Sequence, residues 1–220
     1  LAEGAPRFLH FSSTAAMGLI RRPTIDERVP CQPATPYQRS KYEGEQAALA
    51  AWREHGLPVV VLRPCMVYGP GGKGEFLRFC RWMARGVFPR VGRGPTLTPL
   101  VHVQDVVQAA ILAAGRGVPG EVYLVAAERS YEMAYIREWV LRTLGLRRPY
   151  PYLPLWLALA GALGVELLAR VTGRTPPVTR RNIASTVANR VFDISKARAQ
   201  LGYRPQVTLE EGIAETVAWF

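Results

Sequence analysis

Tyr37 and Lys41 are the two residues in this sequence whose types and spacing best suit acid–base chemistry. On a helix, positions i and i+4 lie on one face, so the lysine ammonium would sit beside the phenol. A free tyrosine has a pKa of about 10 and is a poor acid or base at neutral pH, but a nearby, partly desolvated cation stabilises its ionised form. The spacing alone also occurs in exposed amphipathic pairs, so it needs support from its surroundings.

A run of small polar residues provides that support. Ser12, Ser13 and Thr14 follow an apolar segment, Arg7 to Phe11, that has the composition of a short buried strand. In doubly wound folds, ligands bind beyond the carboxyl ends of the strands. A hydroxyl there can polarise a carbonyl that the tyrosine protonates. The alternative for Thr14 is a cap for the next turn.

The elements around these residues alternate between strands and helices. Alternation of this kind predicts an α/β fold, with a doubly wound parallel sheet and a more helical C-terminal lobe. The last helix should begin with a capping box formed by Thr208 and Glu211. The sequence predicts strands at 7–11, 58–62, 100–103 and 121–126, and helices at 37–55, up to 85, 104–114, 131–144, 153–171, 195–201 and from 208.

Composition narrows the classes of partner. The net charge of +11 comes mostly from arginines spread along the chain, whereas a nucleic-acid binder usually shows a clustered basic stripe, so no nucleic acid is expected. The three cysteines lack C-x-x-C spacing and the three histidines are scattered, which argues against a disulfide framework and against a metal site. We expect a cytoplasmic protein.

The first residues, Leu-Ala-Glu-Gly-Ala-Pro, have neither the basic region nor the apolar region of a signal peptide. They also lack an initiator Met and run almost at once into an apolar strand. We therefore expect the natural polypeptide to begin upstream of Leu1.

Several ordered motifs together resemble the extended short-chain dehydrogenases/reductases, also called the NAD-dependent epimerase/dehydratase superfamily. The motifs are Phe-Leu-His-Phe-Ser-Ser-Thr-Ala-Ala from Phe8, Tyr-Gln-Arg-Ser-Lys from Tyr37, Leu-Arg-Pro-Cys-Met-Val-Tyr-Gly-Pro from Leu62, Val-His-Val-Gln-Asp from Val101, Phe-Asp-Ile-Ser-Lys-Ala-Arg from Phe192 and Leu-Gly-Tyr-Arg-Pro from Leu201.

The resemblance implies roles for several residues of these motifs. Thr14 would polarise the substrate oxygen, Tyr37 would be the general acid/base, and Lys41 would bind the nicotinamide ribose and act on Tyr37. Asp105 would order a loop or cap its helix rather than take part in chemistry. The implied cofactor is NAD or NADP, with contacts from Ser12, Ser13, Tyr37, Lys41, Pro64 and Cys65.

The family's pyrophosphate-binding opening has no counterpart in this sequence. That opening is a strand, a Gly-rich turn and a helix whose N-terminus holds the pyrophosphate. The run Gly69 to Gly74 lacks the spacing of a phosphate-binding loop and ends in Gly where Ser or Thr is needed. We therefore assign 1–73 and 101–128 to the remaining part of a Rossmann-like cofactor domain, and 74–100 and 129–220 to a substrate-binding lobe.

The substrate class is the most open question. Nucleotide-sugar enzymes of the family typically carry Arg where this chain has Thr98, and the C-terminal lobe is apolar from Leu153 to Val165. The sequence is closest in character to the 3β-hydroxysteroid dehydrogenase and dihydroflavonol-reductase-like branch. We expect an apolar steroid-, isoprenoid- or flavonoid-like alcohol or ketone that contacts Thr14, Thr98 and Trp156, with Leu155, Leu159 and Leu163 sharing one helix face. A nucleotide-sugar epimerase or dehydratase is the alternative, with Arg174, Arg180 or Arg181 binding the phosphate in place of residue 98.

A second alternative belongs to another class of protein, a non-catalytic or membrane-associated protein built on the same fold. The apolar run is shorter than the roughly 20 residues of a spanning helix and is more typical of a buried or interfacial one. Peripheral membrane contact and a homodimer both stay open. The presence of Thr14, Tyr37 and Lys41 together favours the enzyme.

Overall fold

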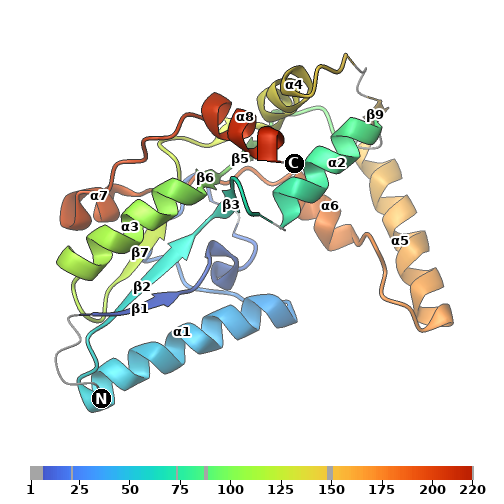
Figure 1. The fold of residues 1–220 in the computed structure, drawn as a ribbon. Helices are drawn as coiled ribbons and strands as arrows, with labels where there is room; N and C mark the ends of the chain where they lie inside the picture. Colours follow the sequence, from blue (N-terminus) through green and yellow to red (C-terminus); the bar gives the residue numbers. More distant parts are fainter. Residues whose placement is uncertain (1–6, 21, 73, 87–88, 148–150, 220) are drawn as a thin grey trace.

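A parallel three-stranded sheet forms the centre of the protein, in a computed structural model that describes residues 7–20, 22–72, 74–86, 89–147 and 151–219 (Figure 1). Its strands are β1 (Phe8–Phe11), β2 (Val59–Pro64) and β7 (Val122–Val125), in the order β1-β2-β7. β2 is buried along its whole length, as expected for a central strand of a parallel sheet.

Helices cover both faces of this sheet, and the pleat of β2 explains how. Successive side chains of a strand point to opposite faces. Val59 and Val61 pack with Leu49 of α1 (Pro36–His55). Val60 and Leu62 belong to the core that includes α3 (Val103–Arg116). The arrangement confirms the predicted doubly wound α/β fold.

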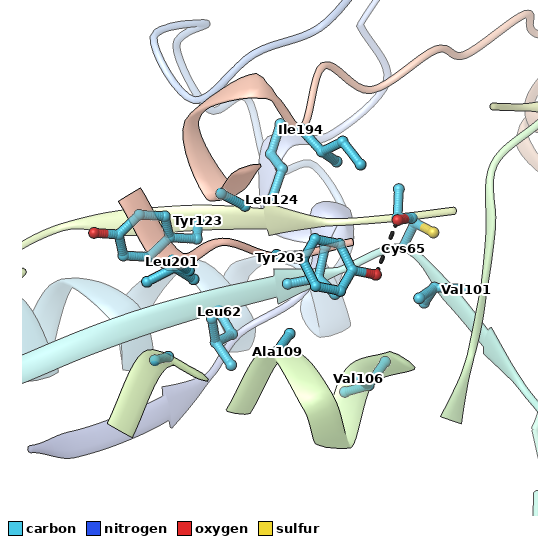
Figure 2. Close-up of a cluster of buried hydrophobic side chains, with 14 of the residues drawn as sticks. Leu62, Cys65, Val101, Val106, Ala109, Tyr123, Leu124, Ile194, Leu201 and Tyr203 are labelled. Atoms are coloured by element: carbon cyan, nitrogen blue, oxygen red, sulfur yellow. Dashed lines mark hydrogen bonds between the residues drawn. The ribbon is translucent and has the colours of Figure 1, made fainter. Parts of the chain in front are cut away.

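The core on the α3 face also contains residues from late in the chain (Figure 2). Ile194, Leu201 and Tyr203 pack there, around α7 (Ser195–Leu201), and the Tyr203 hydroxyl donates to the carbonyl oxygen of Ala126 at 3.0 Å. These residues lie inside the range 129–220 that was assigned to the lobe, yet they pack against the sheet. The division of the chain into two parts stays a prediction.

A second core lies beside the carboxyl end of the sheet. It joins α2 (Glu75–Arg85), α4 (Met133–Thr143) and α8 (Leu209–Trp219) to Tyr68 and Leu100. Those two residues lie on β3 (Met66–Tyr68) and β6 (Leu100–His102), which pair in parallel. The predicted capping box of α8 forms, because Glu211 Oε2 accepts hydrogen bonds from the backbone N–H and hydroxyl of Thr208.

The remaining elements are short, apart from one long helix. They are η1 (Thr14–Met17), β4 (Arg90–Val91) paired with β9 (Tyr152–Leu153), β5 (Leu97–Thr98) paired with β8 (Tyr131–Glu132), α5 (Leu155–Thr172) and α6 (Arg180–Thr186). The sequence did not predict α6. This helix begins with a capping box between Thr179 and Asn182 and is only seven residues long.

The glycine-rich run after β3 is a loop, as predicted, although Lys73 lies outside the described residues. Gly69 has φ +134°, and a Cβ there would lie 2.9 Å from His102 Nε2 and 2.6 Å from Val103 Cγ1. Glycine is therefore required at this position both by backbone conformation and by space.

Candidate active site

The polar run after β1 leads directly into the short helix η1. Ser13 caps the short helix η1, because its hydroxyl accepts a hydrogen bond from the Ala15 N–H at 3.1 Å. Ser12 is buried and Thr14 is half-buried at the first position of η1. The three hydroxyls thus lie where the sequence placed them, beyond the carboxyl end of a parallel strand.

Tyr37 and Lys41 lie on the first two turns of α1. The helix begins with a capping box, in which Thr35 and Gln38 bond each other's backbone, and with Pro36 at its first position. Such a start fixes where the first turn points. The Tyr37 side chain is 58% exposed, so the phenol is open to a ligand.

Two hydrogen bonds join the start of α1 to the end of β1. Lys41 Nζ donates to the carbonyl oxygen of Phe11 at 3.3 Å, and the Ser12 hydroxyl donates to the carbonyl oxygen of Lys41 at 3.5 Å. The structure therefore brings Lys41 and Ser12 into direct contact. Tyr37, one turn before Lys41, and Thr14, two residues after Ser12, lie on the same two segments, and η1 packs against α1.

A buried ion pair that the sequence reasoning missed supports this junction. The guanidinium of Arg63 on β2 binds the carboxylate of Glu45 on α1 through both of its oxygens, at 2.5 and 2.9 Å, and it also donates to Cys31 Sγ at 3.3 Å. Glu45 follows Tyr37 and Lys41 at four-residue spacing on the same helix face, and Arg63 interrupts an apolar strand. Those two features could have singled out each residue, although neither shows that the two pair.

His10 on β1 lies near the same charges. Burial lowers the pKa of its imidazole, opposed by the Glu45 carboxylate and assisted by the Lys41 ammonium. The side chain is therefore neutral at neutral pH. It adds no second positive charge beside Lys41.

Pro64 and Cys65 lie at the carboxyl end of β2, next to the end of β1. The Cys65 N–H donates to the carbonyl oxygen of Val125 at 3.0 Å, which holds the segment against β7. Burial raises the pKa of the Cys65 thiol far above its usual range, so the thiol stays uncharged. Both residues are buried, and Cys65 belongs to the core on the α3 face, so the nicotinamide contact predicted for them stays a prediction.

The other two predicted substrate residues lie on separate elements. Thr98 is buried in β5, opposite Tyr131 of β8. Trp156 lies in the first turn of α5, which packs mainly against α6, and its side chain is 70% exposed. Their contact with substrate stays a prediction, and a tryptophan this open does not by itself enclose a ligand.

Asp105 has the structural role that was expected. Its Oδ1 accepts a hydrogen bond from the backbone N–H of Gln206 at 2.8 Å, which ties the segment before α8 to the start of α3. Burial raises the pKa of the Asp105 carboxyl, opposed by backbone N–H donors of Gln206 and Val207.

Comparison with known proteins identifies the family. The model of the NAD dependent epimerase/dehydratase family matches residues 1–126. The chain belongs to this family. The resemblance stated from the sequence motifs is thereby confirmed, and the family is NAD(P)-dependent.

Relatives come from more than one branch of the family. The chain is 31% identical over 99% of its length to a 3beta-hydroxysteroid-dehydrogenase/decarboxylase isoform 1 of Arabidopsis thaliana, and it covers 54% of that protein. It is 32% identical over 97% of its length to a dTDP-glucose 4,6-dehydratase of an Actinoplanes species, of which it covers 60%. The chain thus spans little more than half the length of these relatives.

Solved structures confirm the Rossmann-like fold. The crystal structure of gox2253 superposes with a TM-score of 0.79 at 31% identity, covering 99% of this chain and 66% of that one. A UDP-glucuronic acid 4-epimerase from Bacillus cereus, solved in complex with NAD, superposes with a TM-score of 0.74 at 20% identity, covering 97% of this chain and 60% of that one.

The described residues fit one half of such a cofactor. Lys41 and the hydroxyls of Ser12 and Ser13 lie at the end of β1, and the uncharged Pro64–Cys65 segment lies at the end of β2. Lys41 and the serine hydroxyls offer hydrogen-bond partners for a ribose, whereas Pro64 and Cys65 are buried and their contact with a nicotinamide ring stays a prediction. For the pyrophosphate, the sequence contains no G-x-x-G-x-x-G run.

Proposed function

We propose that this chain supplies the acid–base half of an NAD(P)-dependent oxidoreductase that interconverts an alcohol and a ketone. The observation that carries the proposal is the hydrogen bond from Lys41 Nζ to the carbonyl oxygen of Phe11. It holds the helix that bears Tyr37 against the strand end that bears the hydroxyls.

Each side chain then has a distinct task. The Thr14 hydroxyl donates a hydrogen bond to the substrate oxygen, and Tyr37 gives a proton to that oxygen or takes one from it. The Lys41 ammonium stabilises the phenolate that forms when Tyr37 has given up its proton. NAD(P), when bound, would supply or accept the hydride.

The substrate class we favour is an apolar alcohol or ketone of steroid, isoprenoid or flavonoid type. Thr98 supports it, because a buried, short and neutral side chain stands where a diphosphate would call for a cation. The similarity to a plant 3beta-hydroxysteroid-dehydrogenase/decarboxylase points the same way.

A nucleotide sugar is the second candidate substrate. The observation in its favour is the 32% identity to a dTDP-glucose 4,6-dehydratase, which is as high as the identity to the steroid enzyme. An enzyme of that kind would need a cation other than residue 98 to bind the diphosphate.

Turnover assays distinguish the two candidates. A polypeptide that carries this chain together with a nucleotide-binding unit is incubated with NAD and with NADP, and with steroid, terpenoid and flavonoid alcohols or with UDP- and dTDP-sugars. We expect turnover of the apolar alcohols only, abolished by Tyr37→Phe. Turnover confined to the nucleotide sugars would contradict the apolar class, and turnover of either kind that survives Tyr37→Phe would contradict the proposed site.

A further inference from the structure

The long helix α5 buries small apolar side chains and exposes large ones. The residues that it buries against the protein are Ala158, Ala162 and Ala169. The large apolar side chains face out, and they include Leu168, which is 64% exposed, and Val171, which is 86% exposed. A helix that packs into a core shows the opposite arrangement.

The exposed residues form a continuous stripe. Trp156, Leu163, Leu167 and Val171 recur at intervals of seven, four and four residues, which places them on one face of a helix. Leu157 and Leu168 widen this face on one side. In Figure 1, α5 runs along the margin of the molecule with α6 beside it, and its outer side faces away from the sheet.

Charge at the end of α5 indicates what covers this face. Between residues 154 and 192 the sequence contains five arginines and one acidic residue, Glu166. The Glu166 carboxylate is bound by the backbone N–H and the guanidinium of Arg180 at 2.8 and 2.9 Å. Arg170, Arg174 and Arg181 are exposed. An apolar face that ends in a basic cluster is complementary to a bilayer whose headgroups are anionic.

The length of α5 helps to distinguish a helix that lies on the membrane surface from one that crosses the bilayer. By length and composition, α5 is the one helix among the described residues that could span a membrane. Its 18 residues extend about 27 Å, slightly less than the roughly 30 Å hydrocarbon core. The alanine side of the helix is occupied by the protein itself. Only the outer face remains for lipid, which is the situation of an interfacial helix.

We propose that the outer face of α5 docks the protein onto the surface of an anionic lipid bilayer. Trp156 would lie at the level of the headgroups, and Arg170, Arg174 and Arg181 would contact the lipid phosphates. A second copy of the chain fits this face less well. A parallel pairing would bring the two arginine clusters together, and an antiparallel pairing would set each cluster against the first turns of the partner helix, which contain no acidic residue. This inference does not depend on the reaction proposed above, and it assigns Trp156 and Leu163 to lipid rather than to the substrate.

Vesicle sedimentation tests the proposal, with vesicles of phosphatidylcholine alone and of phosphatidylcholine mixed with phosphatidylglycerol. The natural polypeptide that contains this chain should bind the mixed vesicles, and weakly or not at all the neutral ones. Arg170→Gln should lower binding about five-fold, since each basic residue near an anionic surface contributes about 1 kcal/mol. Leu167→Glu should lower it by about ten-fold or more.

Matched variants elsewhere on the surface provide the controls. Ile111→Glu changes an even more exposed apolar residue on α3, and Arg53→Gln removes an exposed arginine near the end of α1; both should bind like the unaltered protein. Thermal unfolding checks that each variant is folded. Brominated lipids should quench tryptophan fluorescence, and Trp156→Phe should remove most of that quenching.

Several results would overturn the proposal. One is a lack of binding to anionic vesicles, and another is binding that Leu167→Glu and Ile111→Glu affect alike. A third is a lipid-free dimer, seen by analytical ultracentrifugation, that Leu167→Glu dissociates, because the occupant would then be a second copy.

Discussion

At the residue scale, Tyr37 is the side chain whose loss should stop the reaction with the least disturbance of the fold. Its phenol is more than half exposed, so Tyr37→Phe leaves the packing intact. In a polypeptide that joins this chain to a nucleotide-binding unit, we expect kcat to fall about 10²–10⁴-fold, the usual contribution of a general acid/base. Steady-state kinetics at saturating cofactor measures this fall in kcat. More than about a tenth of the original rate remaining would remove Tyr37 from the mechanism.

Lys41 should behave differently from Tyr37, because it is assigned to the ribose as well as to the phenol. Lys41→Met should lower kcat and also weaken cofactor binding, whereas Tyr37→Phe should leave cofactor binding nearly unchanged. Fluorescence titration with NADH or NADPH separates the two effects. Equal cofactor affinities in the two variants would contradict the role given to Lys41.

The buried pair of Glu45 and Arg63 gives a stability prediction. Removing one partner leaves an uncompensated charge in the interior, so Glu45→Gln should lower the free energy of unfolding by about 3–5 kcal/mol. The double variant Glu45→Met with Arg63→Met should lose much less, because no charge remains buried. Urea unfolding measures both, with Glu54→Gln on the exposed side of the same helix as the control.

The candidate site could be predicted from the sequence only in part. Tyr37, Lys41 and the Ser12–Thr14 run follow from helical spacing and from strand-end position, which are local properties. The partnership of Glu45 with Arg63 is not local, since it joins two elements across a face of the sheet. Sequence spacing suggests that Glu45 shares a face with Lys41, but it does not show which residue lies opposite.

At the element scale, the orientation of α1 depends on its first turn, where Thr35 caps the helix two residues before Tyr37. Thr35→Ala removes one half of the capping box and should cost about 1 kcal/mol of stability. It should also lower kcat, because Tyr37 is carried by the same turn. Thr35→Ser should restore both. Thr179→Ala, which removes the comparable cap of α6, should leave kcat unchanged in the same assays.

The long elements were predicted from the sequence, and the two-residue strands were not. The helices that begin at Pro36 and at Val103, and the strand that begins at Val59, carry a strong periodic or continuous apolar pattern. The strands β4, β5, β8 and β9 contain two residues each, too few to show a period. They exist because segments distant in sequence meet, as Leu97 meets Glu132.

At the scale of the whole molecule, the proposed membrane surface and the proposed substrate class are compatible. An apolar alcohol or ketone partitions into a bilayer, so a protein docked there by α5 would find its substrate concentrated in the same layer. The two proposals can fail separately. Vesicle binding without turnover of apolar alcohols would support the membrane surface and contradict the substrate class. Turnover of apolar alcohols without vesicle binding would support the substrate class and contradict the membrane surface.

Cofactor binding by the 220-residue chain alone gives the last prediction. The described residues offer a ribose contact at Lys41, but the sequence has no G-x-x-G-x-x-G turn to aim a helix N-terminus at the pyrophosphate. Such a helix end supplies backbone N–H donors and a favourable dipole for that group. We expect NADH to bind the purified chain no more tightly than reduced nicotinamide mononucleotide does, with both in the millimolar range. Fluorescence titration of each ligand measures this. Micromolar affinity for NADH, or a clear preference for it over the mononucleotide, would mean that residues of this chain do bind the adenosine diphosphate half.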